Sequence, residues 1–247
     1  MGLNPSDVWV GGYVDYEWNH LPLILEAYKI DPRDLCILEF GCNIAASATV
    51  LAHLGAKVCA IDVSPALLPL ARLNAERYGF PDIDFFCVSD TRTLPFMDGQ
   101  FDLVICNSVL EYVETEHTAS VQREIDRIVK VGGKIFLQGT SNRLWPREVH
   151  SRRWFVNYVP RAADRFLGKP LQRGIWPWTA RHGFGPHYKN LDAADGGTAF
   201  LESRFRMGGP SKAIRALVWL ASKLRVGPGM LAQNISCILE KQTSNAG

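Results

Sequence analysis

The first 141 residues alternate short apolar runs with longer segments whose apolar positions recur at helical spacing. The apolar runs are short and nearly continuous, which is typical of strands buried on both faces of a sheet. Strands are predicted at 35–40, 57–61, 83–88, 101–106 and 134–138. Helices are predicted at 45–54, 64–79 and 118–129. Strands separated by helices require crossover connections, so the pattern predicts an α/β fold with a mostly parallel sheet.

The second predicted helix has a recognisable start. Ser64 is expected to cap it and Pro65 to occupy its first position, where a missing N–H costs nothing. Pro69 follows one turn later and is expected to kink the helix.

After Thr140 the alternation stops. Residues 142–190 contain four of the seven tryptophans together with several prolines and many arginines, so they are predicted to form an inserted cap. Residues 198–207 are expected to return to the sheet, 211–225 to form a basic amphipathic helix, and 234–241 (NISCILEK) to form the last strand. The predicted organisation is an N-terminal helical or cap segment (1–34), a core (35–141), a substrate cap (142–197) and a C-terminal part of the sheet (198–241).

Composition favours an ordinary globular chain in a reducing compartment. The 247 residues are 47% hydrophobic and 21% charged, and no run reaches the roughly 18 apolar residues that span a bilayer. The start of the sequence lacks the features of a secretory signal. The six cysteines show no CxxC pair and no metal-ligand spacing, so we expect a cytoplasmic location and no metal site.

Charge is distributed unevenly along the chain. Residues 1–141 carry 10 Lys and Arg against 19 Asp and Glu, whereas residues 142–247 carry 17 against 6. A basic half joined to an acidic half predicts that the basic half meets an anionic partner.

The stretch after the first strand indicates a nucleotide site. Gly41 follows the strand directly, and Asp62 ends the second strand 21 residues later, a separation that suits a ribose contact. As a dinucleotide fingerprint this is weak, because the full glycine pattern GxGxxG is not present. Ligands of such sheets bind beyond the carboxyl ends of the strands, beside strand one.

A wider set of motifs is more specific. In order they are EFGCNIA from Glu39, DVS from Asp62, VSD ending at Asp90, LPF from Leu94, FDLVICNSVLEYV from Phe101 and VGGK from Val131. Across residues 35–139 this series resembles the class I S-adenosylmethionine-dependent methyltransferases, of the methyltransferase type 11 kind. The resemblance implies a Rossmann-like fold with a mostly parallel seven-stranded sheet, a cap inserted after strand five, and S-adenosyl-L-methionine as cofactor.

The resemblance also implies roles for individual residues. Glu39 and Gly41 would flank the methionine amino group, Cys42 and Asn43 would pass the methionine and ribose, and Asp62 would hold the ribose hydroxyls. Val63 belongs to the same cofactor site. Asp90 would meet the adenine amino group beside Thr91, and Asn107 and Ser108 would lie under the sulfonium.

Two residues depart from the glycines usual in this family. Asn43 tolerates a left-handed backbone better than other non-glycine residues. Ala45 is expected to open the following helix, where helical dihedral angles suit any residue. A relative that no longer binds the cofactor, a binding or scaffold protein with a methyltransferase fold, is the alternative that these departures leave open.

Methyl transfer to a hydroxyl needs a general base. His150, in the cap, is the candidate base, and Glu111 and Tyr16 are the further catalytic candidates. Alternatives for the same role are His117, Tyr112 and Tyr13. Each also has a structural interpretation: His150 as a surface or stacking residue, and Glu111 as a residue that closes the loop after strand four.

The cap suggests the acceptor. Residues 142–181 hold nine Arg and Lys against Glu148 and Asp164. Arginines with aromatic residues suit nucleic acid, an anionic or carrier-linked saccharide, or a peripheral membrane surface on which the helix at 211–225 could lie. Because no RNA-binding module is recognised, we expect O-methylation of a small metabolite or saccharide hydroxyl, with an RNA methyltransferase as the alternative.

Overall fold

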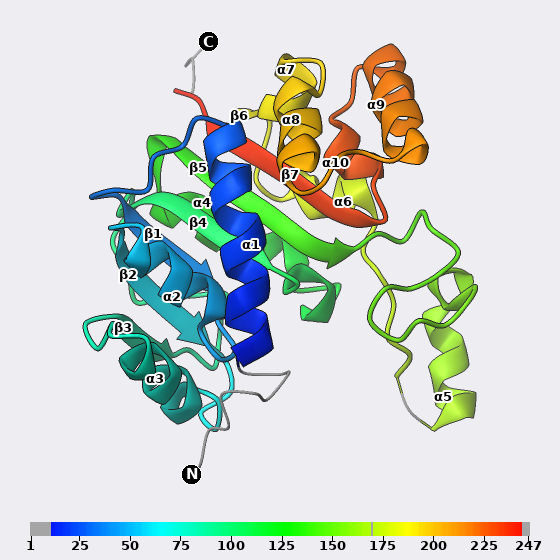
Figure 1. Ribbon diagram of the computed structural model, residues 1–247. Helices are drawn as coiled ribbons and strands as arrows, with labels where there is room; N and C mark the ends of the chain where they lie inside the picture. The colour runs from blue at the N-terminus through cyan, green and yellow to red at the C-terminus, as the bar shows by residue number, and fades with distance from the viewer. Residues whose placement is uncertain (1–10, 169, 244–247) are drawn as a thin grey trace.

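The computed structural model describes residues 11–168 and 170–243. Residues 1–10 of the predicted N-terminal segment and Lys169 of the predicted cap lie outside the described residues. The described chain forms one seven-stranded sheet with helices on both faces, so the predicted α/β Rossmann-like fold is confirmed (Figure 1).

The sheet has the order β3-β2-β1-β4-β5-β7-β6. The first five strands of the chain are parallel, and β7 is antiparallel to both β5 and β6. The strands are β1 Cys36–Phe40, β2 Lys57–Asp62, β3 Asp84–Cys87, β4 Phe101–Asn107, β5 Val129–Ser141, β6 Tyr188–Asn190 and β7 Asn234–Lys241. The carboxyl ends of β1, β2 and β4 therefore lie side by side at one edge of the sheet, as the sequence predicts.

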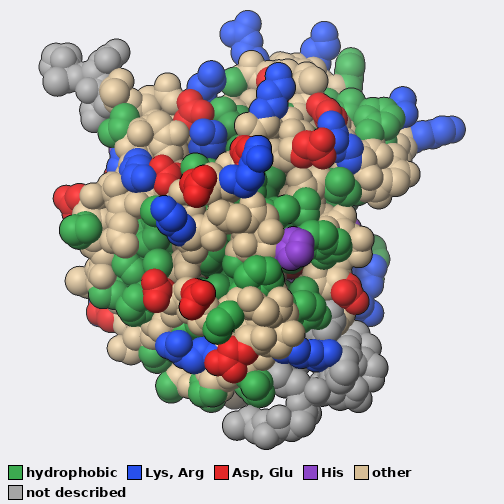
Figure 2. All heavy atoms as spheres, turned by 60° about the vertical axis from the view of Figure 1, so that its left-hand side comes forward, with side chains coloured by type: hydrophobic (Ala, Val, Ile, Leu, Met, Phe, Trp, Pro, Cys, Tyr) green, Lys and Arg blue, Asp and Glu red, His purple; other side chains and the backbone are tan. Residues whose placement is uncertain are grey.

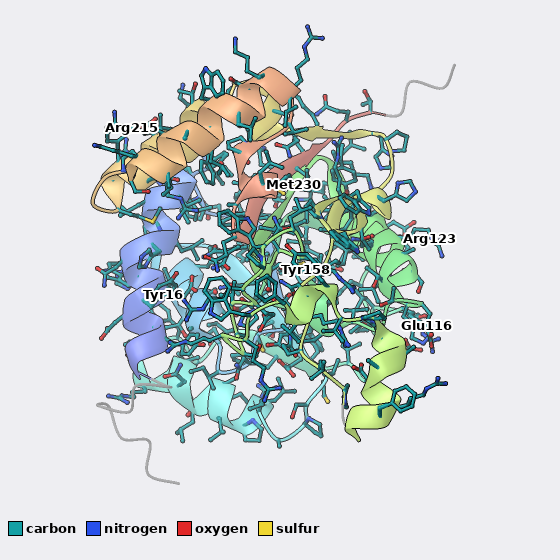
Figure 3. All side chains as sticks on the ribbon, turned by 90° about the vertical axis from the view of Figure 1, so that its right-hand side faces the viewer. Tyr16, Glu116, Arg123, Tyr158, Arg215 and Met230 are labelled. Atoms are coloured by element: carbon teal, nitrogen blue, oxygen red, sulfur yellow. The ribbon has the colours of Figure 1, made fainter. Side chains whose placement is uncertain are left out.

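The helices divide between the two faces of the sheet. The α-helices are α1 Gly11–Ala27, α2 Ala46–His53, α3 Leu68–Arg77, α4 Thr118–Ile128, α5 Asp164–Leu167, α6 Pro177–His182, α7 Leu191–Ala194, α8 Thr198–Arg206, α9 Lys212–Leu224 and α10 Pro228–Leu231. Side chains of α1, α2 and α3 share a buried cluster on one face, and α4 and α6 share another on the opposite face. Figure 3 shows Tyr16 on α1 and Arg123 on α4 at opposite sides of the molecule.

Hydrophobic spacing explains why these helices pack as they do. On α4, Val121, Ile125 and Ile128 recur at helical spacing and are buried against the sheet. Strand β4 is buried on both faces, with Val104 in one cluster and Ile105 in the other.

One expectation for the C-terminal third is wrong. Residues 198–207 do not return to the sheet: Thr198–Arg206 is helix α8, and its buried residues Ala199, Phe200 and Ser203 follow helical spacing. The sixth strand is instead β6, within the predicted cap. Its three residues are too few to show a strand pattern in the sequence.

The start of α3 also differs from the prediction. The helix begins at Leu68, four residues after Ser64, and Ser64 to Leu67 form a turn. Pro69 therefore lies in the first turn, where it removes no helical hydrogen bond, and the expected kink does not arise.

The first part of the predicted cap leaves the sheet at Asn142 and returns to it at Ile175, and hydrogen bonds join the two ends of this excursion. A bridge pairs Asn142 with Ile175, and the buried Asn157 side chain donates to the carbonyls of Asn142 and Trp145 and accepts from the Gly174 N–H. The excursion and α5 project to one side of the sheet (Figure 1). Within the described residues, every helix is too short or too polar to cross a bilayer.

Candidate functional site

A cavity of about 1130 Å³ lies at the carboxyl ends of β1, β2, β4 and β5. The residues predicted to bind the cofactor all line it: Glu39, Gly41, Cys42, Asn43, Asp62, Val63, Asp90, Thr91, Asn107 and Ser108. Tyr16 and His150 line the same cavity. Its volume exceeds the roughly 300–1,000 Å³ of typical small-molecule pockets, so two ligands can fit side by side.

The loop from β1 to α2 forms one wall of the cavity and has a backbone that normally requires glycine. Gly41, Asn43 and Ala45 all have positive φ, at 79°, 48° and 59°. The prediction for Ala45 is therefore wrong: it precedes α2 in a left-handed conformation and does not share the helical dihedral angles. A left-handed alanine costs roughly 1–2 kcal/mol, which the surrounding fold must offset.

Gly41 allows the loop to lie close to the segment after β4. A Cβ atom at Gly41 would lie 2.5 Å from Cγ2 of Val109, closer than atoms can approach. Gly139 of β5 is similar, because a Cβ there would lie 2.4 Å from Oγ of Ser108. Both glycines border the cavity, so they allow the segments that form its wall to pack closely together.

Asp62 holds the loop in place. Its Oδ2 accepts a hydrogen bond from the Asn43 N–H at 2.9 Å, and its Oδ1 accepts one from the Ser64 N–H at 2.9 Å. Each carboxylate oxygen has a further lone pair, so the side chain can still accept from ribose hydroxyls.

A buried polar network lies beneath this end of the cavity. Asn107 Nδ2 donates to Glu17 Oε1 at 2.8 Å and approaches Ser47 Oγ at 3.4 Å. Glu39 Oε2 accepts from the Ala48 N–H at 2.9 Å, so its carboxyl fixes the start of α2. Glu17, which lies on α1 and is 2% exposed, was missed by the sequence reasoning, since a lone glutamate in a helix carries no signal.

Burial changes the titration of both glutamates. It raises the pKa of Glu17 to about 7 and that of Glu39 to about 8, although hydrogen bonds from neighbouring groups partly oppose it. Glu17 Oε2 is buried without a hydrogen-bond partner among the described residues. The network is therefore short of donors, and a cationic or hydrogen-bonding ligand group would satisfy it.

Asp90 lies at the opposite end of the cavity and is already paired. Arg92 donates to both of its carboxylate oxygens at 2.8 Å, and this lowers the pKa of Asp90 to about 2. The Asp90–Arg92 pair is exposed, so both side chains remain accessible to an adenine ring.

His150 and Glu111, 39 residues apart, form a hydrogen-bonded pair. Nε2 of His150 lies 2.9 Å from Oε1 of Glu111, whose side chain is fully buried. Glu111 also accepts from the Ser141 N–H at 3.3 Å. This contact with Glu111 raises the pKa of His150 above its usual value.

The pairing defines what His150 can do. Donation from Nε2 to the carboxylate leaves the lone pair of the neutral ring on Nδ1, which is the arrangement of a general base. Tyr112 packs near the ring, with centroids 6.0 Å apart. Within the described part of 142–190, His150 is the residue that lines the cavity, so the cap contributes this side chain and little else to its wall.

The remaining wall comes from α1, which carries the candidates Tyr13 and Tyr16, and from α8 and β7, which the sequence did not connect with the site. Tyr16 is about half exposed and stacks on His20, with ring centroids 4.0 Å apart. No contact within the described chain joins Tyr16 to His150. Arg204, Met207 and Ser236 complete this side.

The alternative base His117 lies beside Glu114, with Nε2 and Oε2 3.4 Å apart. Ligand atoms of Glu114, Glu116 and His117 fall within 4.8 Å of one another, but the carboxylates are exposed and such clusters are common without an ion. The expected absence of a metal stays a prediction.

Comparisons with known proteins agree with this geometry. Residues 38–137 match the family described as "Methyltransferase domain". The chain is 32% identical over 145 residues to a ubiquinone biosynthesis O-methyltransferase of Pseudomonas aeruginosa, covering 57% of this chain and 61% of that one. It is 35% identical over 153 residues to the protein of the same name from Xanthomonas axonopodis pv. citri, covering 60% and 62%.

The chain thus spans about three-fifths of the length of the curated relatives it matches. Among solved structures, an S-adenosylmethionine-dependent methyltransferase from Mesorhizobium loti superimposes with a TM-score of 0.56 at 18% identity, covering 92% of this chain and all of that one. At that identity the likeness shows the fold alone.

Proposed function

We propose that the chain is a class I S-adenosylmethionine-dependent methyltransferase, the family whose domain residues 38–137 match, and that it methylates a hydroxyl group of a small molecule. S-adenosylmethionine is the methyl donor of this family. The acceptor is a small metabolite or a saccharide, and the product is a methyl ether.

The observation that carries the proposal is the His150–Glu111 pair beside the cofactor residues. A hydroxyl is a poor nucleophile until its proton is removed, and the pair supplies a base held by a buried carboxylate. His150 lines the same cavity as Asn107 and Ser108, which border the expected position of the sulfonium. Once the hydroxyl has lost its proton, transfer of the methyl group depends mainly on the orientation of the two reactants and on the exclusion of water, and no further catalytic group is required.

The residues present also suit the cofactor. Gly41 and Gly139 allow the segments that carry the cofactor residues to pack closely, and Asp62 can accept from ribose hydroxyls while it holds the loop. The donor-poor network of Glu17, Glu39 and Asn107 suits a cationic methionine end. These groups would position the donor, and the reactive methyl group is supplied by the cofactor.

A small acceptor is favoured over RNA because the arginines of the cap are partly used within it. Arg173 is paired with Asp164 and is 4% exposed, and Arg143 donates from Nε to the carbonyl of Asn157. The face in Figure 2, which is turned away from the cap, carries acidic and basic side chains mixed together, with Lys and Arg at its upper edge. The curated relatives are named O-methyltransferases, which supports a hydroxyl acceptor.

A cytoplasmic location is part of the proposal. All six cysteines are unpaired, and Cys87 is exposed, as suits a reducing compartment.

The test begins with calorimetric titration of the purified chain with S-adenosylmethionine and S-adenosylhomocysteine. We expect micromolar dissociation constants for both, followed by transfer of labelled methyl groups to members of a phenol and sugar panel. A folded sample that binds neither compound overturns the proposal in favour of a non-catalytic binding protein. Methylation of RNA, with affinity that falls steeply with salt, would replace the small acceptor by RNA.

A further inference from the structure

Arg204 of α8 is a cation without an ionic partner in the wall of the cavity. Its Nε is buried and has no hydrogen-bond partner, and no ion pair of Arg204 is found within residues 11–168 and 170–243. The guanidinium lies over the Phe200 ring, 4.8 Å from its centroid. Stacking of this kind fixes the plane of the group and leaves its edge available.

Asp192 is the carboxyl whose charge acts on Arg204, but no ion pair or hydrogen bond between the two is found among the described residues. Asp192, on α7, is fully buried and accepts a hydrogen bond from the Tyr28 hydroxyl. Burial raises the pKa of Asp192 to about 7, so near neutral pH this carboxyl is only partly ionised. A guanidinium stays protonated in proteins, so Arg204 remains a desolvated positive charge.

Arg204 is also distinguished from the other cation in the cavity wall. Arg92, the second Arg or Lys among the lining residues, is taken up by both oxygens of Asp90. Among the described residues that line the cavity, Arg204 is therefore the one arginine without an ion pair. Its single positive charge suits a ligand with one negative charge better than a dianion.

The position of Arg204 separates it from the cofactor residues. Those residues lie at the carboxyl ends of β1, β2, β3 and β4, whereas Arg204 lines the cavity from α8, which packs against α1. The guanidinium therefore belongs to the half of the cavity left for the acceptor.

We propose that Arg204 binds a carboxylate of the acceptor, so that the substrate is a hydroxylated carboxylic acid. This inference rests on the proposed function and narrows its acceptor. The guanidinium fork pairs with a carboxylate through two parallel hydrogen bonds, which fixes the orientation of the acceptor as well as its affinity. The neutral hydroxyl of the acceptor would then meet His150, which lines the same cavity as Arg204.

The test uses two probes that differ by one group, catechol and 3,4-dihydroxybenzoate. Each is titrated calorimetrically into the wild-type chain, Arg204→Gln and Arg204→Lys, with and without saturating S-adenosylhomocysteine. We expect wild type to bind the acid at least tenfold more tightly than catechol. Arg204→Gln should abolish that preference, Arg204→Lys should retain part of it, and catechol should bind all three alike.

Three outcomes overturn the proposal. The first is a wild-type chain that binds the acid no more tightly than catechol. The second is a preference that persists in Arg204→Gln. The third is a loss of S-adenosylhomocysteine affinity in Arg204→Gln with 5′-methylthioadenosine affinity unchanged, which would assign the guanidinium to the carboxylate of the cofactor.

Failure of the proposed function gives a different signature. A chain that binds no S-adenosylhomocysteine, yet still prefers the acid through Arg204, loses its methyltransferase assignment and keeps its carboxylate site. Arg204→Lys also separates a folding defect from a loss of recognition, because it preserves the charge.

Discussion

Asn107 at the end of β4 donates a hydrogen bond to Glu17 in the middle of α1, 90 residues earlier in the chain. This contact joins the N-terminal helix to the polar network beneath the cofactor end of the cavity. It also places a carboxyl with a raised pKa inside the fold, and the stability of the protein should depend on it.

Replacement of Glu17 by Gln should flatten the dependence of stability on pH. The pKa of Glu17 is about 7 in the folded chain against 4.5 when unfolded, so the folded state keeps a proton that the unfolded state loses. The contribution of Glu17 to the free energy of unfolding is complete below pH 4.5 and is lost as the pH rises through 7. At about 1.4 kcal/mol per pKa unit, the wild-type free energy of unfolding should lose about 3 kcal/mol from this group.

Urea unfolding at pH 5 and pH 7.5 measures most of this difference. Glu116→Gln, at an exposed position, is the matched control and should retain the wild-type slope. Equal slopes for Glu17→Gln and wild type would contradict the assignment. Glu39 and Asp192 contribute in the same direction, so a residual slope is expected in Glu17→Gln.

Replacement of His150 by Ala should lower kcat by roughly 10²- to 10⁴-fold, the usual contribution of a general base. The affinity for S-adenosylhomocysteine should stay unchanged, because His150 belongs to the acceptor side. Only the neutral ring can accept a proton, so wild-type kcat should rise with pH through a pKa above 6.5.

A pH profile of kcat from 5.5 to 9 checks this, with Glu111→Gln as companion variant. Loss of the carboxylate should move the rising limb to lower pH while part of the activity remains. A His150→Ala profile that keeps the wild-type limb would assign the base to another group.

Replacement of Gly41 by Ala should damage the cofactor site for a steric reason. The new Cβ would meet Val109, and φ is +79°, so we expect at least a tenfold loss of S-adenosylhomocysteine affinity. Adding Val109→Ala should restore part of that loss by removing the clash, while the backbone strain remains.

Gly79→Ala is the matched control, because Gly79 has φ +86° and a Cβ added there would meet no atom within 4 Å. It should cost about 1 kcal/mol of stability or more, leave cofactor affinity intact and gain nothing from Val109→Ala. The measurements are S-adenosylhomocysteine affinity and thermal unfolding. They compare the wild type with Gly41→Ala and Gly79→Ala, each alone and combined with Val109→Ala. Rescue of Gly79→Ala by Val109→Ala would contradict the steric account.

Replacement of Asp62 by Ala should weaken S-adenosylhomocysteine binding by about 1–3 kcal/mol, the cost of leaving polar groups unpaired. The loss includes the two loop N–H groups that Asp62 holds as well as the ribose contact. Asp84→Ala, at the amino end of the neighbouring strand, should bind as wild type does. Calorimetry on both variants makes the comparison, and wild-type affinity in Asp62→Ala would remove the residue from the site.

The sequence predicted the parts of the fold that repeat a pattern. Buried strands such as 101–106 and the amphipathic helix at 118–129 are indicated by the spacing of their apolar residues, and both are confirmed. The three residues of β6 are too short for a pattern, and residues 198–207 have apolar positions that fit either a strand or a helix.

The residues of the candidate site also include some that the sequence identified and some that it missed. Asp62 was singled out because it ends a predicted strand at the separation of a ribose contact, and Asn107 because of the family resemblance; both line the cavity. Glu17 and Arg204 were not found, because their place in the cavity depends on how α1 and α8 pack against the sheet. Tertiary packing of this kind leaves no local trace in the sequence.

The loop from Gly41 to Ala45 has a broader consequence for recognising such sites. It contains three residues with a left-handed backbone, and only one of them is glycine. The dihedral angles therefore show the shape of this loop, whereas the amino-acid sequence does not indicate it. A search for glycine-rich fingerprints passes over loops of this kind. A search for the succession of positive φ angles between a buried strand and a helix would find them.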